Sequence, residues 1–289
     1  MDLSIILPAR NEGENLASLL PRLRELHPTA EIILVNDGSS DNTEEIAAAN
    51  HVICISHPYS MGNGAAIKTG ARTAAGDILV FMDADGQHKP EDVSRLMELL
   101  RNRNFDMVVG ARSRGSQASI ARLLANKLYS KMASFMTGKN IADLTSGFRA
   151  VRRDKFKKFL YLLPNGFSYP TTITMAFFRS GYSVAYMDID TLKRKGESKI
   201  NIFRDGTRFF IIILRIGALF SPMRLFLPLS FAMFAAGIGY YIYTYITSNR
   251  FTNMSALLLT SALLIFLIGI VSEQISSLHY RDVESRDDK

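Results

Sequence analysis

Residues 78–88 read ILVFMDADGQH, and this stretch decides the fold. Its first half, Ile78–Met82, is a short apolar run with β-branched residues, which is typical of a strand buried on both faces of a parallel sheet. Alternate side chains of an extended strand point the same way, so Asp83 and Asp85 are expected to lie together at its carboxyl end. Open α/β sheets bind their ligands at this end. We therefore expect an α/β fold with a binding site around two carboxylates.

The rest of the first 110 residues continues this alternation of strand and helix. Apolar runs predict further strands at residues 3–7, 32–35, 51–55 and 107–109, and helical patterns predict helices at residues 15–26, 43–50, 65–75, 91–102 and 119–136. Residues 140–200 show a mixed pattern. Strands that alternate with helices are typical of α/β folds with a largely parallel sheet.

Asp83, Asp85 and Gln87 have the composition of a site for a hard divalent cation. Two carboxylates on one side of a strand end repel each other unless a cation lies between or beyond them. Mg²⁺ or Mn²⁺ accepts one or two carboxylates and fills its other positions with water and phosphate oxygens. Such an ion can offset the charge that builds on a leaving nucleoside diphosphate. The alternative is a loop of solvated acids, because Asp-x-Asp strings are common.

Polar turns also follow the first two predicted strands, PARNEG at 8–13 and VNDGSSD at 35–41. Both fall where an α/β sheet binds nucleotides. A carboxylate such as Asp37 can accept a hydrogen bond from a ribose hydroxyl or a base N–H. Ordinary turn chemistry at Asp37 and helix capping by Asp41 are the alternatives.

Two uncharged, mostly apolar stretches, residues 225–249 and 251–272, are each long enough to cross a bilayer as a helix. A helical hairpin buried in a soluble core is the alternative, although soluble helices rarely run so far without a charged face. Residues 193–224 hold eight basic and two acidic side chains. Basic flanks stay in the cytoplasm, so we expect the N-terminal region and the tail on that side. Residues 200–222 combine arginines with apolar side chains and are expected to form an amphipathic interfacial helix.

Composition excludes several classes of protein. Of the 289 residues, 47% are hydrophobic, which excludes intrinsic disorder and low-complexity structure. The single cysteine, Cys54, excludes a disulfide framework and a four-thiolate zinc site. The net charge is +7, and most of it lies in residues 193–224. Because this stretch adjoins the predicted spans, anionic lipid headgroups explain the charge better than nucleic acid does, and no nucleic-acid partner is expected.

Seven motifs occur in an order that resembles one enzyme family. They are PARNEG, VNDGSSD, MGNGAAIKTG at 61–70, DADGQH at 83–88, GAR at 110–112, LTSGFR at 144–149 and RKGESK at 194–199. Over roughly residues 1–200, the series resembles the polyprenyl-phosphate glycosyltransferases of the inverting glycosyltransferase family 2. This group contains dolichyl-phosphate mannosyltransferase and bacterial undecaprenyl-phosphate hexosyltransferases. The apolar C-terminal hairpin is similar to that of the bacterial members.

The resemblance implies a domain order. A GT-A (nucleotide-diphospho-sugar transferase) domain would span residues 1–199, followed by the interfacial amphipathic helix at 200–222, transmembrane helices at 223–249 and 251–273, and a cytoplasmic tail at 274–289. The protein would be integral to the cell membrane or an ER-type membrane, with the catalytic domain and both termini cytoplasmic. Some similar proteins are oligomers, so a homo-oligomer is an open alternative.

The resemblance also implies a role for each motif residue. The base and ribose of a UDP- or GDP-linked sugar would meet residues of the first two turns, namely Pro8, Arg10, Glu12, Val35 and Asp37. Asp83 and Ala84 would approach the donor, Asp85 and Gln87 would hold Mg²⁺ or Mn²⁺, and Arg194 and Lys195 would meet the diphosphate. Arg112 and Arg149 would bind the acceptor phosphate, which completes an expected catalytic set of Asp83, Asp85, Arg112 and Arg149.

The remaining alternatives for the function differ mainly in the acceptor of the sugar. Undecaprenyl or dolichyl phosphate is already anionic and can attack the anomeric carbon without a general base, whereas a hydroxyl acceptor needs one. Asp143 lies beside LTSGFR and is the candidate base of a hydroxyl-acceptor enzyme. A processive polysaccharide synthase is disfavoured because its acceptor motif needs a tryptophan, and the chain has none. A non-catalytic membrane scaffold is disfavoured because Asp83, Asp85 and Gln87 are all present.

Overall fold

The computed structural model describes residues 2–112, 120–166, 168–191 and 221–284, together with residues 211, 214, 215 and 217–219. The chain divides into two compact units, Met1–Lys131 with Asn140–Phe210, and Met132–Lys139 with Ile211–Lys289. The interfacial helix predicted at residues 200–222 falls mostly outside the described residues. Arg194 and Lys195 lie outside them as well.

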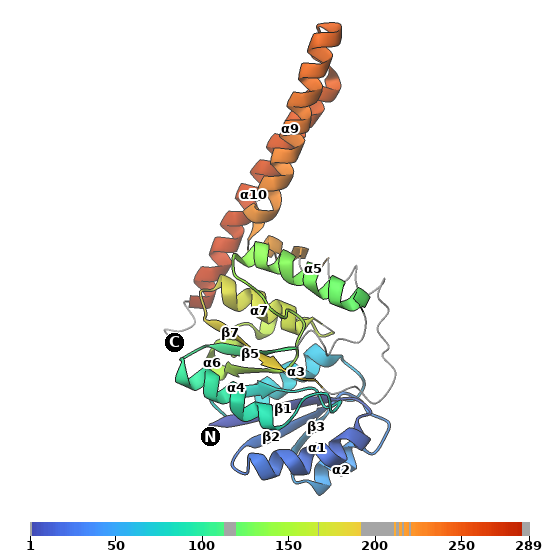
Figure 1. Ribbon diagram of the computed structural model, residues 1–289, viewed down its shortest axis with the longest axis vertical. Helices are drawn as coiled ribbons and strands as arrows, with labels where there is room; N and C mark the ends of the chain where they lie inside the picture. The colour runs from blue at the N-terminus through green and yellow to red at the C-terminus, as the bar shows by residue number, and fades with distance from the viewer. Residues whose placement is uncertain are drawn as a thin grey trace. The chain divides into compact units, whose positions relative to one another are not determined.

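A seven-stranded mixed sheet forms the centre of the first unit (Figure 1). Its strands are β1 (Leu3–Ala9), β2 (Glu31–Asn36), β3 (Ile53–Ser56), β4 (Ile78–Phe81), β5 (Met107–Arg112), β6 (Arg149–Arg152) and β7 (Val184–Ile189), in the order β3-β2-β1-β4-β6-β5-β7. β1 pairs in parallel with β2 and β4. The strands that follow β1, namely β2 and β3, lie on one side of it, and the chain then crosses to β4 on the other side. This reversal of strand order places a topological switch point at the carboxyl ends of β1 and β4.

All five strands predicted from apolar runs are present, and the predicted α/β fold is confirmed. Two strands within residues 140–200 were not predicted. β6 reads RAVR and has arginines at both ends, so it shows no apolar run. It lies between β4 and β5 and runs antiparallel to both. The expectation of full burial is wrong for β3, because it is an edge strand whose side chains are exposed or half-buried.

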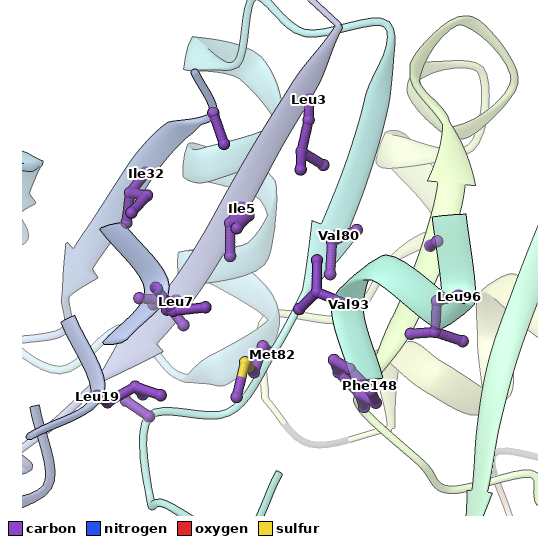
Figure 2. Close-up of a cluster of buried hydrophobic side chains, with 14 of the residues drawn as sticks. Leu3, Ile5, Leu7, Leu19, Ile32, Val80, Met82, Val93, Leu96 and Phe148 are labelled. Atoms are coloured by element: carbon purple, nitrogen blue, oxygen red, sulfur yellow. The ribbon is translucent and has the colours of Figure 1, made fainter. Parts of the chain in front are cut away.

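Helices cover both faces of this sheet. They are α1 (Gly13–Leu26), α2 (Thr43–Ala49), α3 (Asn63–Thr73), α4 (Glu91–Asn102), α6 (Arg153–Lys157) and α7 (Tyr169–Arg179), with a 3-10 turn η2 (Leu160–Leu162). A further helix, α5 (Ile120–Thr137), belongs partly to each of the two units. Figure 2 shows Leu3, Ile5 and Leu7 of β1 side by side in one cluster with Val93 and Leu96 of α4. This spacing of two is the alternation that places every second strand residue on one face.

The opposite face of the sheet packs against α3, α6 and α7. Ile6 of β1 lies against Gly70 of α3, where an added Cβ would come within 2.4 Å of Ile6 Cγ2. Phe81 of β4 contacts Phe156, with ring centroids 4.7 Å apart, and Tyr169, at 6.1 Å. The central strands are therefore buried on both faces, and the polar residues at their carboxyl ends follow directly from this packed core.

The second unit contains the antiparallel helices α9 (Pro222–Ser248) and α10 (Asn253–Glu284). Both are long and apolar enough to cross a membrane, and only 11% and 17% of their most apolar segments are buried. This exposure does not fit the alternative of a hairpin buried in a soluble core. Where the helices meet, the Ser230 hydroxyl donates to the Ala262 carbonyl at 2.8 Å, and Gly237 leaves room for Leu259. Small residues and interhelical hydrogen bonds are typical of helix packing in lipid.

Candidate active site

Asp83, Asp85 and Gln87 lie in the turn that follows β4, as the sequence predicts. Because β4 ends at Phe81, the alternation of strand side chains does not extend to Asp83 and Asp85, which corrects the reason given for their proximity. The Asp83 side chain is 36% exposed, and Asp85 and Gln87 are half-buried. Asp85 Oδ1 accepts the backbone N–H of Gln87 at 3.2 Å, and Gly86 between them adopts a φ of +72° that a side chain would disfavour. The turn thus presents carboxylate oxygens next to the end of a buried strand.

This turn fits a magnesium-type ion better than a protein-only metal cage. Among the described residues, no group of three or more His, Cys, Asp and Glu side chains is placed to hold a metal. Mg²⁺ commonly takes only one or two carboxylates and completes its shell with water and phosphate. The oxygen donors of Asp83 and Asp85 have the required chemistry, and they remain partly open to solvent.

Asp37 is buried and folds the loop at residues 57–62. Its Oδ1 lies 2.8 Å from His57 Nδ1 and accepts the Met61 N–H at 2.8 Å. Its Oδ2 accepts from the Ser60 hydroxyl at 2.8 Å and the Gly62 N–H at 2.9 Å. Burial by itself would raise the pKa of Asp37. The hydrogen bonds from His57 and from this loop lower the pKa by more, so the net pKa is below the ordinary value. A base or ribose could reach this carboxylate only by displacing one of these partners.

The turns after β1 and β2 are joined to each other. The Asn11 N–H donates to Ser39 Oγ at 2.9 Å, and the Ser40 N–H donates to Asn11 Oδ1 at 2.8 Å. Asp41 Oδ2 accepts the Gly13 N–H at 2.9 Å, so this residue ties the start of α1 to the second turn. Asp41 Oδ1 also accepts the N–H of Thr43, the first residue of α2, at 3.1 Å, so this side chain satisfies a free N–H at the helix start as expected, although the N-cap position itself is Asn42.

The other expected donor residues have different environments. Arg10 is exposed, and Pro8 and Glu12 are half-buried. Val35 and Ala84 lie in the core with 0% and 2% exposure. Contacts of Val35 and Ala84 with the donor would therefore involve their backbone groups, because both side chains are buried.

Arg112 and Asp143 form an ion pair through two hydrogen bonds. Arg112 Nε donates to Asp143 Oδ2 at 2.8 Å and Nη2 donates to Oδ1 at 3.1 Å. Asp143 Oδ1 also accepts the N–H groups of Thr145 at 3.0 Å and Ser146 at 3.1 Å. Burial would raise the pKa of Asp143, but the Arg112 guanidinium and the loop N–H groups hold it below the ordinary value. A carboxylate in this state has little tendency to take a proton from a hydroxyl.

Arg149 lies in the interior with 0% exposure. Its Nη1 donates to the Pro170 carbonyl at 3.2 Å and Thr174 Oγ1 at 3.1 Å, and its Nη2 donates to the Ser146 carbonyl. The expected contact of Arg149 with an acceptor phosphate does not fit this placement. The reason is the strand register: Arg149 pairs with Phe81 of β4 in the middle of the sheet, so both side chains face the buried side toward α7.

Three neighbours of Asp83 were not assigned a role from the sequence. His88 Nε2 lies 3.9 Å from Asp83 Oδ2, and the His88 ring stacks on Phe148 at 4.8 Å. A Cβ added at Gly147 would lie 2.9 Å from Asp83 Oδ2. His88 belongs to the motif DADGQH, and Gly147 and Phe148 belong to LTSGFR, so these two motifs could have indicated that the three residues are part of the site. Their proximity depends on the pairing of β4 with β6, which the sequence did not reveal.

An open α/β sheet with carboxylates at its switch point, followed by an apolar hairpin, defines a GT-A domain joined to a candidate membrane anchor. The chain belongs to glycosyl transferase family 2, whose family profile matches residues 4–160. A second profile, the GtrB C-terminal hairpin, matches residues 221–278. The two matches confirm the family that the ordered motifs predicted.

Curated relatives match over the first of these regions. An undecaprenyl-phosphate 4-deoxy-4-formamido-L-arabinose transferase of Proteus mirabilis (strain HI4320) is 39% identical over 160 residues, which is 52% of this chain and 48% of the relative. The transferase of the same description from Yersinia pestis (strain Pestoides F) is 38% identical over 160 residues, with the same coverage. The chain therefore spans about half the length of the curated relatives it matches.

Solved structures confirm the GT-A fold. Glucosyl-3-phosphoglycerate synthase from Mycobacterium tuberculosis in complex with phosphoglyceric acid superposes with a TM-score of 0.62 and 22% identity, covering 74% of this chain and 79% of that one. Its complex with Mn²⁺, UDP-glucose and phosphoglyceric acid gives 0.62 and 21%, covering 75% and 79%. At this identity the likeness establishes the fold alone.

Proposed function

We propose that this protein transfers a sugar from a nucleotide-diphosphate sugar to a polyprenyl phosphate, with inversion at the anomeric carbon. The family match, the GtrB-type hairpin and the undecaprenyl-phosphate transferases among its relatives support this proposal. The product would be a lipid-linked sugar that serves as a donor for glycan assembly. A UDP- or GDP-linked hexose is the finer form of the same proposal.

The state of Asp143 is the observation that carries the choice of acceptor. Its carboxylate is paired with Arg112, accepts two N–H groups of its own loop and has a lowered pKa. A hydroxyl acceptor requires a base that takes its proton, and such a base works best with a pKa near the operating pH. A polyprenyl phosphate carries its negative charge already, so it needs a cation to hold it and no base.

Each residue of the site then has a task. Asp85 and Gln87 would hold Mg²⁺ or Mn²⁺, which when bound offsets the charge on the leaving nucleoside diphosphate. Asp83 would face the ribose or the sugar of the donor. Arg112, oriented by Asp143 and 27% exposed, would bind the acceptor phosphate. Pro8, Arg10, Glu12 and Asp37 remain proposed donor-pocket residues, and Arg194 and Lys195 remain proposed partners of the diphosphate.

A matched pair of acceptors tests the proposal. The full-length protein in lipid nanodiscs is incubated with Mg²⁺ or Mn²⁺ and a panel of UDP-glucose, UDP-galactose, UDP-N-acetylglucosamine, GDP-mannose and UDP-4-deoxy-4-formamido-L-arabinose. The acceptor is undecaprenyl phosphate, dolichyl phosphate or undecaprenol, which has the same chain without the phosphate. We expect nucleoside diphosphate release and a new glycolipid mass with one of the phosphates and neither with undecaprenol.

Transfer to undecaprenol or to a sugar hydroxyl, without transfer to either lipid phosphate, would support the hydroxyl-acceptor alternative with Asp143 as base. Binding of donors without turnover on any acceptor would support the non-catalytic scaffold.

A further inference from the structure

Arg149 places a charged guanidinium in the interior, where a charge is costly unless its hydrogen bonds are satisfied. Among the described residues, its hydrogen bonds to oxygen go to two carbonyls and one hydroxyl, of Pro170, Ser146 and Thr174, and none goes to a carboxylate. The guanidinium also lies over the Tyr169 ring, 5.6 Å from its centroid. Two of these partners, Pro170 and Thr174, belong to α7, and Ser146 belongs to the loop that precedes β6.

Tyr169 holds the same loop one residue further along. Its hydroxyl donates to the Gly147 carbonyl at 2.9 Å, and its ring is buried against Phe81. Arg149 and Tyr169 therefore fix the consecutive carbonyls of Ser146 and Gly147 from the buried side. Asp143 accepts the N–H groups of Thr145 and Ser146, so residues 145–147 are held by hydrogen bonds from three side chains.

The outer side of this loop touches Asp83. A Cβ at Gly147 would lie 2.9 Å from Asp83 Oδ2 and 3.3 Å from Oδ1, so the bare backbone of Gly147 forms a wall beside the carboxylate. Phe148, the next residue, stacks on His88, whose Nε2 faces the same carboxylate. The position of residues 146–148 therefore sets the space in which Asp83 can orient.

We propose that Arg149 and Tyr169 are positioning residues that act on Asp83 through the backbone of Ser146 and Gly147. They hold two carbonyls of the loop so that the Gly147 backbone confines the Asp83 carboxylate in the orientation that the donor meets. Neither side chain touches a substrate in this arrangement. The kinetic part of this inference rests on the proposed function, and its structural part does not.

The test compares Tyr169→Phe and Arg149→Lys with the wild type, as full-length protein in nanodiscs. Tyr169→Phe removes a single hydroxyl and keeps the buried ring, so it retains the packing. Tyr182→Phe is the matched control, because it also loses one hydroxyl, whose hydrogen bond among the described residues is to Lys158 Nζ and not to the loop. Amide hydrogen exchange of residues 144–148 is measured by mass spectrometry, together with kcat and KM for undecaprenyl phosphate at saturating donor from the panel.

We expect faster exchange at residues 144–148 in both variants, with the central strands unchanged. Net hydrogen-bond contributions predict that kcat falls about 3- to 10-fold for Tyr169→Phe and about 10-fold or more for Arg149→Lys. KM for undecaprenyl phosphate should stay within about twofold, and Tyr182→Phe should match the wild type in every measurement. The double variant should lose less than the product of the single losses, because both residues act on one loop.

Two results would overturn the inference. Unchanged exchange at residues 144–148 in both variants would show that these side chains do not hold the loop. A rise in KM for undecaprenyl phosphate at unchanged kcat would show that Arg149 binds the acceptor after all. If the wild type transfers no sugar from any donor, the proposed function fails, and the exchange measurement still decides the structural part.

Discussion

Gly147 determines the geometry around Asp83 because its backbone leaves no room for a side chain there. An alanine Cβ at this position would lie within 3.3 Å of both carboxylate oxygens. The carboxylate must then rotate or shift, since the backbone is held from behind by Tyr169 and Arg149. Misplacement of a reacting group by about 1 Å can cost about 100-fold in rate.

We therefore predict that Gly147→Ala lowers kcat by about 10- to 100-fold while the protein stays folded. Steady-state kinetics and a thermal melt measure the two effects. Gly166→Ala is the matched control, because a Cβ at Gly166 meets nothing within 4 Å, and it should keep wild-type kcat. Wild-type turnover in Gly147→Ala would mean that the orientation of Asp83 does not limit the reaction.

The second prediction at this scale concerns the metal. Excess EDTA should abolish transfer, and Asp85→Asn should lower turnover by about 100-fold or more, because a charge that offsets the leaving diphosphate is lost. Asp154→Asn is a suitable control, since Asp154 is exposed and pairs only loosely with Lys155 at 3.6 Å. Full activity in EDTA would rule out the metal role of Asp85 and Gln87.

At the scale of elements, the loop at residues 57–62 depends on one buried carboxylate. Asp37 accepts four hydrogen bonds and has a pKa below the ordinary value in the folded protein. A depressed folded-state pKa contributes stability that is present above the unfolded value of about 3.9 and is lost as pH falls through the folded value. The contribution is therefore complete at neutral pH and disappears in acid.

Asp37→Asn should accordingly lower the melting temperature at pH 7, and the gap to the wild type should narrow below about pH 4. Thermal melts at pH 7, 5, 4 and 3 measure the gap. Asp154→Asn should show a small gap at every pH, because an exposed pair contributes little. A gap for Asp37→Asn that stays constant from pH 7 to pH 3 would contradict this account.

At the scale of the whole molecule, a family 2 domain is joined to an apolar hairpin, and the basic stretch at residues 193–224 precedes that hairpin. Two crossings return the chain to the side from which it started. The connection between the helices is short: Asn249 ends α9 in a left-handed conformation with φ of 51°, and α10 begins at Asn253. Positive flanks are retained in the cytoplasm.

A reporter fused after Lys289 should therefore lie in the cytoplasm, and one inserted at Asn249 should lie outside. Paired reporters that are active on opposite sides of the membrane measure this. A cytoplasmic signal from both positions would show that the hairpin does not cross the bilayer. Attraction of residues 200–222 to anionic lipid and the formation of a homo-oligomer remain separate predictions.

The sequence by itself determined the features that depend on local pattern. The apolar run at residues 78–82 and its counterparts predicted five strands, because burial on both faces leaves a recognisable composition. Two long uncharged stretches predicted the hairpin, and the order of seven motifs predicted the family. The position of Asp83 and Asp85 at a strand end was also predictable, because they follow the apolar run at residues 78–82 directly in the sequence.

Only the tertiary structure decided what these residues contact. Antiparallel β6 inserts between β4 and β5, and the alternation of strand side chains then sends Phe148 toward His88 and Arg149 toward α7. Arg112 is 31 positions from Asp143, and their pairing turns a candidate base into a hydrogen-bond acceptor with a lowered pKa. These contacts join segments that are far apart in the chain, so no local periodicity of the sequence encodes them. The order and register of the strands determine on which side of the sheet each charged side chain lies.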